Sequence, residues 1–194
     1  MNLFGNDLTL IAVGIESAQE LLPAFNGDAQ YLRWSGYPSG MMSLQEVRDD
    51  IQETAALPGG STWRIADREG RLIGVAETAL HPSATIGWIA LLIIRREFQG
   101  RGYGHEAATL LKDYLFSSPE VTEIGLGVLI QNTPAQAFWE NCGYVRKTRR
   151  SDTHGNDCYV YRLPRSTVIK GAGKDWEQQG ENLMADGEKG IPNP

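Results

Sequence analysis

The segment Ile86-Gly-Trp-Ile-Ala-Leu-Leu-Ile-Ile-Arg-Arg-Glu-Phe-Gln-Gly-Arg-Gly-Tyr-Gly104 decides the fold of this chain. Its first part, Ile86 to Ile94, is mostly apolar and partly β-branched and lacks helical periodicity, which predicts a strand buried on both faces. After the glycines, apolar residues recur at helical spacing, which predicts a helix from Gly102 to Phe116 that packs one face on a sheet. The sequence therefore indicates a strand, a glycine-rich turn and a helix in succession.

The glycine-rich turn is predicted to bind an anion. Gly100, Gly102 and Gly104 permit backbone conformations and a close approach that a Cβ atom would prevent. The first N–H groups of the following helix have no partner within it, and the helix dipole and Arg101 add positive charge there. These features favour phosphate, and the alternative is a plain tight turn. A P-loop would require Lys-Ser or Lys-Thr after the last glycine, and the glycines do not follow the dinucleotide pattern.

Two blocks of sequence resemble one family. Gln99-Gly-Arg-Gly-Tyr-Gly104 fits Gln/Arg-x-x-Gly-x-Gly at the end of a strand and resembles the acetyl-CoA loop of the GNAT N-acetyltransferases. Downstream, Asn132-Thr-Pro-Ala-Gln-Ala-Phe-Trp-Glu-Asn-Cys-Gly-Tyr144 resembles the Asn-x-x-Ala-x-x-Phe-Tyr-x-x-x-Gly-Phe block of that family. The order and spacing of the two blocks agree with the family. The resemblance extends over about Asp7 to Leu163, and its specific motifs lie between Leu91 and Tyr144.

The resemblance implies an α/β (α+β) fold in which residues 1–163 form a single GNAT-like domain. A central mixed, mostly antiparallel sheet of about seven strands would carry helices on both faces. The fourth strand, Ile86 to Ile94, would contain a bulge and splay from the fifth strand, Thr122 to Ile130. Residues 164–194 are rich in Gly, Lys, Glu, Gln and Asn, and they are expected to form a flexible tail.

Local patterns predict the remaining elements. Further strands are expected at Asp7 to Ile15, Ser61 to Asp67, Arg71 to Leu80, Tyr144 to Arg149 and Cys158 to Leu163. A turn at Arg68-Glu-Gly-Arg71 is expected to place Gly70 at positive φ. Helices are predicted at Ala18 to Phe25, from the capping box Ser43-Leu-Gln-Glu46 to about Ala56, and after Asn132 with Thr133 as the N-cap. The segment Gly27 to Met42 is expected to be a loop.

Composition and charge narrow the classes of partner. The chain has 194 residues, of which 41% are hydrophobic, and a net charge of −6 without acidic blocks. Nucleic acid and anionic membrane surfaces favour basic patches, so neither is expected as a partner, and a cationic acceptor is favoured. Cys142 and Cys158 lie sixteen positions apart without a Cys/His cluster, which argues against a metal site and a disulfide framework. The sequence shows no leader pattern or membrane-spanning run, so a cytoplasmic protein is expected.

By resemblance, the co-substrate is acetyl-CoA, held along the splayed strand and the glycine loop. Ile94 would pair with the pantetheine arm, and the Leu92 backbone amide would face the thioester oxygen. The pyrophosphate would lie on the loop formed by Gln99, Gly100, Arg101, Gly102, Tyr103, Gly104 and His105. Asn132 would reach the pantetheine, and Trp139 would pack along the co-substrate. By analogy with the family, a homodimer is also allowed.

The reaction implied by the resemblance is direct transfer of acetyl from acetyl-CoA to a primary amine, of a small molecule or a protein N-terminus, in a ternary complex. The amine must be neutral to attack, and Glu77 and His81 are the candidate general bases. For Glu77 the alternative is a cross-strand ion pair. Tyr31, Trp34 and Tyr37 are candidates for contact with the acceptor, or else for local packing.

One residue departs from the family pattern. Trp139 occupies the position at which a tyrosine often protonates the departing thiolate, and an indole N–H cannot serve as that acid. Tyr103 or a water would then supply the proton, or the thiolate would leave unaided. Two other functions therefore stay open: a non-catalytic acyl-CoA-binding or regulatory module of the same fold, and a nucleotide-binding protein.

Overall fold

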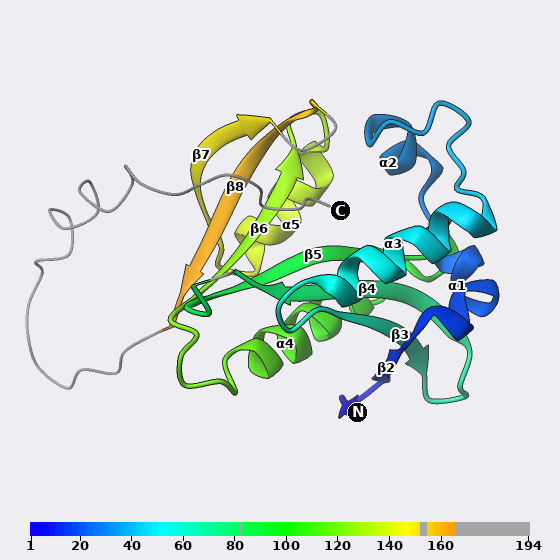
Figure 1. Ribbon diagram of the computed structural model, residues 1–194, viewed down its shortest axis with the longest axis horizontal. Coiled ribbons are helices and arrows are strands. Elements are labelled where there is room, and N and C mark those ends of the chain that lie inside the picture. The colour runs from blue at the N-terminus through cyan, green and yellow to red at the C-terminus, as the bar shows by residue number, and fades with distance from the viewer. Residues whose placement is uncertain (82, 152–154, 166–194) are drawn as a thin grey trace, which may run out of the picture.

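The computed structural model describes residues 1–81, 83–151 and 155–165, which form one open sheet covered by helices (Figure 1). These residues contribute eight strands in the order β1-β2-β3-β4-β5-β6-β8-β7, of which only the β5–β6 pair is parallel. The strands are β1 (Asn2–Phe4), β2 (Leu8–Val13), β3 (Ser61–Asp67), β4 (Leu72–Leu80), β5 (Ile86–Ile94), β6 (Glu123–Leu129), β7 (Val145–Ser151) and β8 (Asp157–Pro164). The predicted mixed, mostly antiparallel sheet is confirmed.

The sheet has one strand more than the sequence predicted. The additional strand is β1, which pairs Leu3 with Leu10 and Phe4 with Thr9 of β2. It spans three residues, which is too short for an alternating pattern to be recognised. Most of the expected C-terminal tail, residues 166–194, lies outside the residues that the structure describes.

Helices cover both faces of the sheet, as predicted (Figure 1). The helices are α1 (Ala18–Phe25), α2 (Ala29–Trp34), α3 (Leu44–Ala56), α4 (Tyr103–Leu115), α5 (Thr133–Asn141) and the short 3-10 helices η1 (Ile15–Ser17) and η2 (Arg96–Phe98). On one face, Ala107 and Leu111 of α4 are buried in a core that includes residues of β2 and β3. On the other face, α1, α2 and α3 share a second core with Leu91 and Ile93 of β5. Within the described residues, no helix is long and apolar enough to span a membrane.

β5 and β6 separate after a short paired segment. Pairing is limited to Ile86 with Glu123, Gly87 with Ile124 and Trp88 with Gly125. Beyond these pairs, β5 stays with β4 and β6 stays with β8. Figure 1 shows β6 and β8 turning away from β4 and β5. The predicted splay between these two strands is confirmed.

A bulge in β5 accompanies the splay. Thr78 of β4 faces Ile89, and the next residue, Glu77, faces Leu91, which leaves Ala90 without a partner. The extra residue reverses the side-chain alternation, so Ile89 joins the core on the α4 side and Leu91 joins the core on the α3 side. The bulge expected from the family resemblance is therefore present, and it directs Leu91 toward α3.

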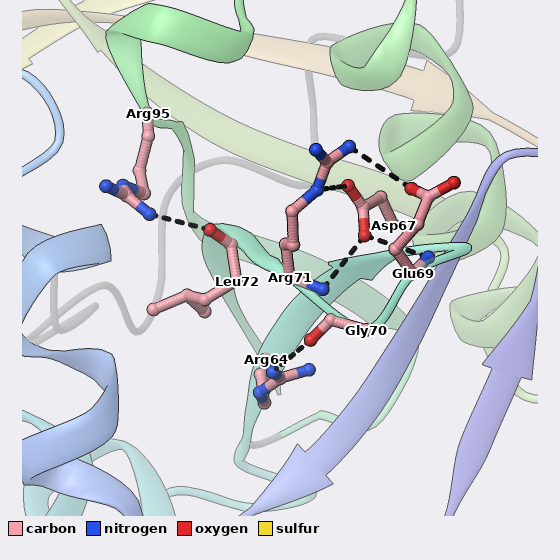
Figure 2. Close-up of polar contacts among 7 residues, drawn as sticks. All are labelled: Arg64, Asp67, Glu69, Gly70, Arg71, Leu72 and Arg95. Atoms are coloured by element: carbon pink, nitrogen blue, oxygen red, sulfur yellow. Dashed lines mark hydrogen bonds and ion pairs between the residues drawn. The ribbon is translucent and has the colours of Figure 1, made fainter.

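The hairpin between β3 and β4 is fixed by a polar cluster at its turn (Figure 2). Buried Asp67 accepts hydrogen bonds from Arg71 N–H over 2.9 Å and Arg71 Nε over 2.6 Å, and from the N–H of Glu69 over 3.1 Å. Burial alone would raise the pKa of Asp67, but the bonds and charge of Arg71 hold it below the ordinary value. Gly70 has φ 78°, as predicted. The turn therefore sets the register of β4.

Two local predictions need correction. The segment expected to be a loop contains α2, whose N-cap Asp28 accepts hydrogen bonds from the N–H groups of Gln30 and Tyr31, each over 3.0 Å. Helix α5 is capped by Asn132 and not by Thr133. The capping box of α3 is confirmed in both directions. Short polar caps explain both errors, because one Asp or Asn at the entry position suffices to start a helix.

Candidate active site

The separation of β5 from β6 opens a cleft with a cavity of about 440 Å³. Its walls include residues 89–94 of β5 and residues 126–129 of β6. It is also lined by the start of α5 and by four residues of the glycine loop, Gln99, Gly100, Gly102 and Gly104. The cleft therefore lies between the two sequence blocks that predicted the site, where the facing edges of two strands have parted.

The open edge of β5 carries the backbone N–H groups of Leu92 and Ile94. The Arg95 N–H donates to the Ile73 carbonyl of β4 over 2.9 Å. Since successive residues of a strand direct their N–H groups to opposite edges, Leu92 and Ile94 direct theirs away from β4 and toward the cleft. At the same edge, the Ile94 carbonyl accepts a hydrogen bond from Gln99 Nε2 over 2.8 Å. Gln99 therefore ties the glycine loop to the end of β5.

The glycine loop owes its shape to two left-handed residues. Gly100 and Gly102 have φ angles of 74° and 87°. A Cβ atom at either position would meet no heavy atom within 4 Å, so the backbone conformation, and not crowding, requires glycine there. Gly102 is the N-cap of α4, and no side chain of the described residues caps this helix end. The first N–H groups of α4 therefore remain available at the border of the cleft.

The predicted loop residues fall into two groups. The members that line the cleft are Gln99, Gly100, Gly102, Gly104 and His105. Arg101 is exposed and holds its guanidinium 5.8 Å from the ring centroid of Phe98, and half-buried Tyr103 packs against the core on the α4 side. The structure therefore does not bring the side chains of Arg101 and Tyr103 to the cleft, and Tyr103 is not placed to protonate a thiolate there.

Trp139 and Asn132 of the second block line the cleft as well. The Trp139 side chain is 7% exposed and makes edge-to-face contacts with Phe138 and Tyr144, at centroid distances of 4.9 and 5.1 Å. Asn132 Oδ1 accepts a hydrogen bond from the Ala135 N–H over 3.2 Å. Trp139 is thus held as a rigid wall, and the side-chain oxygen of Asn132 is used in capping α5.

Glu77 lies on β4 and is completely buried. Its Oε1 accepts a hydrogen bond from Thr62 Oγ1 over 2.8 Å, while Oε2 has no hydrogen-bond partner among the described residues. Burial raises the pKa of Glu77 well above its ordinary value, and the negative charge of Asp50 on α3 raises it further. In the described part of the chain Glu77 makes no ion pair, so the cross-strand ion pair considered for it is wrong. Glu77 does not line the cleft itself.

His81 follows the end of β4 and lies away from the cleft. Its N–H donates to the Ile86 carbonyl over 2.9 Å, at the end of β5 that is still paired with β6. Its ring Nδ1 is 2.9 Å from Ser83 Oγ. Because the cleft opens at the opposite end of β5, the structure does not bring His81 to it. Of the two predicted bases, only Glu77 pairs with a residue of β5 that lines the cleft, Leu91.

A second cavity of about 160 Å³ adjoins the cleft. The residues that line both cavities are Tyr31, Ser35, Leu91 and Ile93. Tyr37 lines the second cavity alone, and Trp34 lines neither of the two. Two of the three aromatic residues predicted to contact the acceptor therefore lie at the junction or in the adjoining cavity.

The sequence interpretation missed the acidic residues of α3 that line the second cavity, which are Glu46, Asp49, Asp50 and Glu53. Their spacing of three and four places them on one face of the helix, beside the buried face of Val47 and Ile51. This spacing is visible in the sequence, but the sequence does not show what the face contacts. No group of His, Cys, Asp or Glu in the described ranges is arranged to hold a metal ion.

The chain belongs to the GNAT acetyltransferase family. The family model described as "Acetyltransferase (GNAT) family" matches residues 28–144, which is more than half of the chain. No curated protein sequence matches the chain.

Solved structures support the same fold. An acetyltransferase from Thermus thermophilus is 23% identical with a TM-score of 0.67, covering 85% of this chain and 100% of its own. The ribosomal L7/L12 α-N-protein acetyltransferase RimL, in complex with coenzyme A, is 15% identical with a TM-score of 0.70. The match covers 84% of this chain and 98% of the RimL chain. The spermidine N-acetyltransferase from Vibrio cholerae, in complex with coenzyme A and spermine, is 19% identical with a TM-score of 0.65. The match covers 81% of this chain and 95% of that enzyme's chain. The GNAT fold predicted from the two sequence blocks is thereby confirmed.

Proposed function

We propose that the protein transfers an acetyl group from acetyl-CoA to a primary amine by direct attack in a ternary complex. The observation that carries the proposal is the open edge of β5, where the Leu92 and Ile94 N–H groups face a cleft that ends at the N-terminus of α4. Such a site suits an extended chain that carries amides along its length and a pyrophosphate at one end. The pantetheine diphosphate part of acetyl-CoA has this form.

The comparisons support the two substrates to different degrees. Membership of the GNAT family supports acetyl transfer, and structures of this fold that contain coenzyme A support acetyl-CoA as the donor. Acetyltransferases named for spermidine and for a ribosomal protein are among the similar structures, which supports an amine as the acceptor.

The backbone around the cleft would do most of the binding. Ile94 pairs with the pantetheine arm, and the first N–H groups of α4 beside Gly102 hold the pyrophosphate. The Leu92 N–H faces the thioester oxygen, on which negative charge develops as the amine attacks. A donor fixed at this position contributes about 3–4 kcal/mol to acyl transfer in other enzymes. The N–H groups of Leu92 and Ile94 have no partner strand on the cleft side of β5, so both are available to bind acetyl-CoA.

The reaction forms a bond between the amine nitrogen and the carbonyl carbon and breaks the bond between that carbon and sulfur. The ammonium form of the acceptor loses one proton before attack, and the nitrogen loses a second as the amide forms. One of these two protons is taken up by the departing thiolate, so one proton is released overall. The amine substrate therefore needs a base that takes up its proton, and the departing sulfur needs a proton donor.

Two side chains at the second cavity suit these proton transfers. Asp50 lines that cavity and is half-buried, so it can accept a proton from the nitrogen. The phenol of Tyr31 lines both cavities and takes the place of the tyrosine that Trp139 replaces. Glu77 lines neither cavity and acts as a positioning residue next to Asp50; burial, and then the negative charge of Asp50, raise the pKa of Glu77.

A titration with acetyl-CoA tests the proposal, with ATP and NAD as comparison ligands. The matched variants are Gly102→Ala and Gly102→Glu, which place the same backbone strain at φ 87° and differ in the carboxylate. We expect acetyl-CoA alone to raise the melting temperature. Gly102→Ala should keep most of this effect, and Gly102→Glu should abolish it because its carboxylate repels the pyrophosphate.

Thiol release in the presence of an amine panel separates the enzyme from a non-catalytic acyl-CoA-binding module. Trp139 is the observation that favours the module, since an indole cannot protonate the thiolate. Stabilisation by acetyl-CoA without thiol release from any amine would select the module. Absence of stabilisation by acetyl-CoA would refute the assignment of the cleft.

A further inference from the structure

β5 and β6 are paired over one short segment, and the last pair of that segment is Trp88 with Gly125. Beyond this pair the two strands part and form the walls of the cleft (Figure 1). We call the pair of Trp88 and Gly125 the vertex of the cleft. A change in the angle between β5 and β6 at the vertex therefore changes the width of the cleft.

Arg162 of β8 lies across the vertex. Its guanidinium carbon is 5.2 Å from the ring centroid of Trp88, and its Nε is 3.4 Å from Oε1 of Glu123 on β6. A Cβ atom on Gly125 would overlap both Arg162 Nη1 and the Trp88 ring, so the two side chains cover Gly125. The guanidinium of Arg162 therefore links β8 to β6 and to β5 where the three strands meet.

This link lies on the face of the sheet opposite α4. Ile89 and Tyr161 join the core on the α4 side, so their neighbours Trp88 and Arg162 point to the other face. Trp88 is buried but belongs to neither of the two cores of the described residues. On this face the guanidinium, and not a hydrophobic core, therefore joins the strands at the vertex.

Stability alone does not explain an arginine at this position. The Arg162 side chain is 14% exposed, and its Nη1 is buried without a hydrogen-bond partner among the described residues. Burial lowers the pKa of Arg162, and the charge of Glu123 offsets this effect only in part. A buried donor without an acceptor is unfavourable, and an apolar side chain of similar length would avoid the penalty. Residues that depart from such rules are expected at functional sites.

We infer that Arg162 is a positioning residue for acetyl transfer, which holds β5 and β6 at the angle at which the cleft accepts the pantetheine arm of acetyl-CoA. The inference rests on the proposed function, because that function places the arm between the two strands. A planar guanidinium stacked on the indole of Trp88 restricts rotation of β6 and β8 against β5. Arg162 lines neither cavity, so it acts through the strands and not on the substrates.

A small rotation at the vertex becomes a large displacement at the reacting centre. Leu92, whose N–H faces the thioester oxygen in the proposed function, lies about 13 Å along β5 from Trp88, so a rotation of about 5° moves it by about 1 Å. A misplacement of about 1 Å costs about 10²-fold in rate in other enzymes. If only a fraction of the molecules hold the productive angle, the apparent affinity for acetyl-CoA falls by that fraction.

The test is Arg162→Met, because methionine has a similar length and needs no hydrogen-bond partner. The affinity for acetyl-CoA should fall about tenfold, as expected if about a tenth of the molecules hold the productive angle, and kcat should fall as well. ADP carries a diphosphate without the pantetheine arm and reports on the glycine loop, so its affinity should stay at the wild-type value.

The melting temperature of Arg162→Met should be unchanged or higher. The substitution removes a buried guanidinium with an unsatisfied donor, and Glu123 stays hydrated because its side chain is 32% exposed. A residue with a purely structural role would lose stability and activity together. Loss of acetyl-CoA affinity without loss of stability is therefore the signature of positioning.

The matched control is Arg165→Met, three residues further along the chain. Arg165 Nε donates to the Val121 carbonyl over 2.9 Å, and its Nη2 donates to the carbonyls of Phe116 and Ser118 over 2.8 and 2.6 Å. Loss of these bonds should lower the melting temperature. Well below that temperature, kcat and the affinity for acetyl-CoA should stay near wild type.

Gly125→Ala disturbs the vertex from the other side and keeps the inference testable if Arg162→Met does not fold. The added Cβ displaces the side chains of Arg162 and Trp88, so we expect the same selective loss of affinity for acetyl-CoA over ADP. Unchanged affinity for acetyl-CoA in Gly125→Ala would overturn the inference.

The outcomes separate the two proposals. Failure of wild-type protein to bind acetyl-CoA refutes the proposed function. Wild-type affinity and kcat in Arg162→Met overturn the positioning role and leave the proposed function standing. Equal losses for acetyl-CoA and ADP with a lower melting temperature would show a general loss of folded structure, which also overturns the positioning role. A loss of acetyl-CoA affinity in Arg165→Met equal to that in Arg162→Met would overturn it as well.

Discussion

Replacing Glu77 by Gln should stabilise the protein at neutral pH. The substitution keeps the acceptor for the Thr62 hydroxyl and replaces the carboxyl group by a neutral amide of nearly the same shape. Glu77 is a carboxyl group whose pKa is raised in the folded protein, first by burial and then by Asp50. Its contribution to stability is therefore present below the pKa of the unfolded chain, about 4.3, and is lost as pH rises toward the folded pKa.

The magnitude follows from proton linkage. While Glu77 keeps its proton in the folded state and loses it in the unfolded state, the free energy of unfolding falls by about 1.4 kcal/mol per pH unit. For a domain of this size that slope corresponds to roughly 3–6 °C in melting temperature per pH unit, and it ends where Glu77 loses its proton in the folded state as well. Gln carries no charge at any pH. The difference in stability between variant and wild type should therefore grow with pH up to that point.

Thermal and urea unfolding at several pH values between 5 and 8 would measure this difference. Glu120→Gln is the control, since it removes an exposed carboxylate and should change stability little. Parallel pH profiles for wild type and Glu77→Gln would refute the reasoning, because they would show that Glu77 titrates as it does in the unfolded chain. A variant less stable than wild type at pH 7.5 would refute it as well.

Two further substitutions test the site and the hairpin. Tyr31→Phe should lower kcat by about 10²-fold with little change in the affinity for acetyl-CoA. The control Tyr37→Phe alters only the second cavity and should leave kcat near wild type. Equal kcat values for the two variants in the thiol-release assay would exclude Tyr31 as the proton donor. Asp67→Asn should cost about 1–3 kcal/mol of stability at pH 7 in urea unfolding, because Asp67 is buried and bonded to Arg71. The pKa of Asp67 is held low, so its contribution is present above the unfolded pKa of about 3.9 and is lost as pH falls below that value. The stability gap to Asp67→Asn should shrink in acid, and a gap independent of pH would contradict this account.

Local sequence patterns were enough to predict the central elements of the fold. The apolar run Ile86–Ile94 and the glycines after it predicted β5, the loop and α4 because each depends on neighbouring residues only. The capping box at Ser43 likewise predicted the start of α3. The errors fell where the signal is short: a strand of three residues at β1 and a helix of six residues at α2. In such short elements, pairing and packing outweigh local preference.

Much of the site depends on contacts between residues far apart in the chain. Sequence identified Glu77 and His81 as equivalent candidates, and the direction of β4 separates them, because the cleft opens at the far end of β5 from His81. Sequence also proposed the Arg101 side chain for phosphate, whereas the fold holds it over Phe98. Side-chain direction at a loop is set by packing with other elements, which local patterns do not record.

By itself, the sequence determined the class of fold and the loop that suits a phosphate, because strand type, glycine conformation and helix start are local properties. The tertiary structure alone decided that α3 crosses the sheet above Glu77 and brings Asp50 next to it. It also decided that four acidic residues of α3 line a cavity that shares part of its wall with the cleft. The physical reason is that burial and charge fields depend on distance in space, and these residues meet only when the helix packs on the strands.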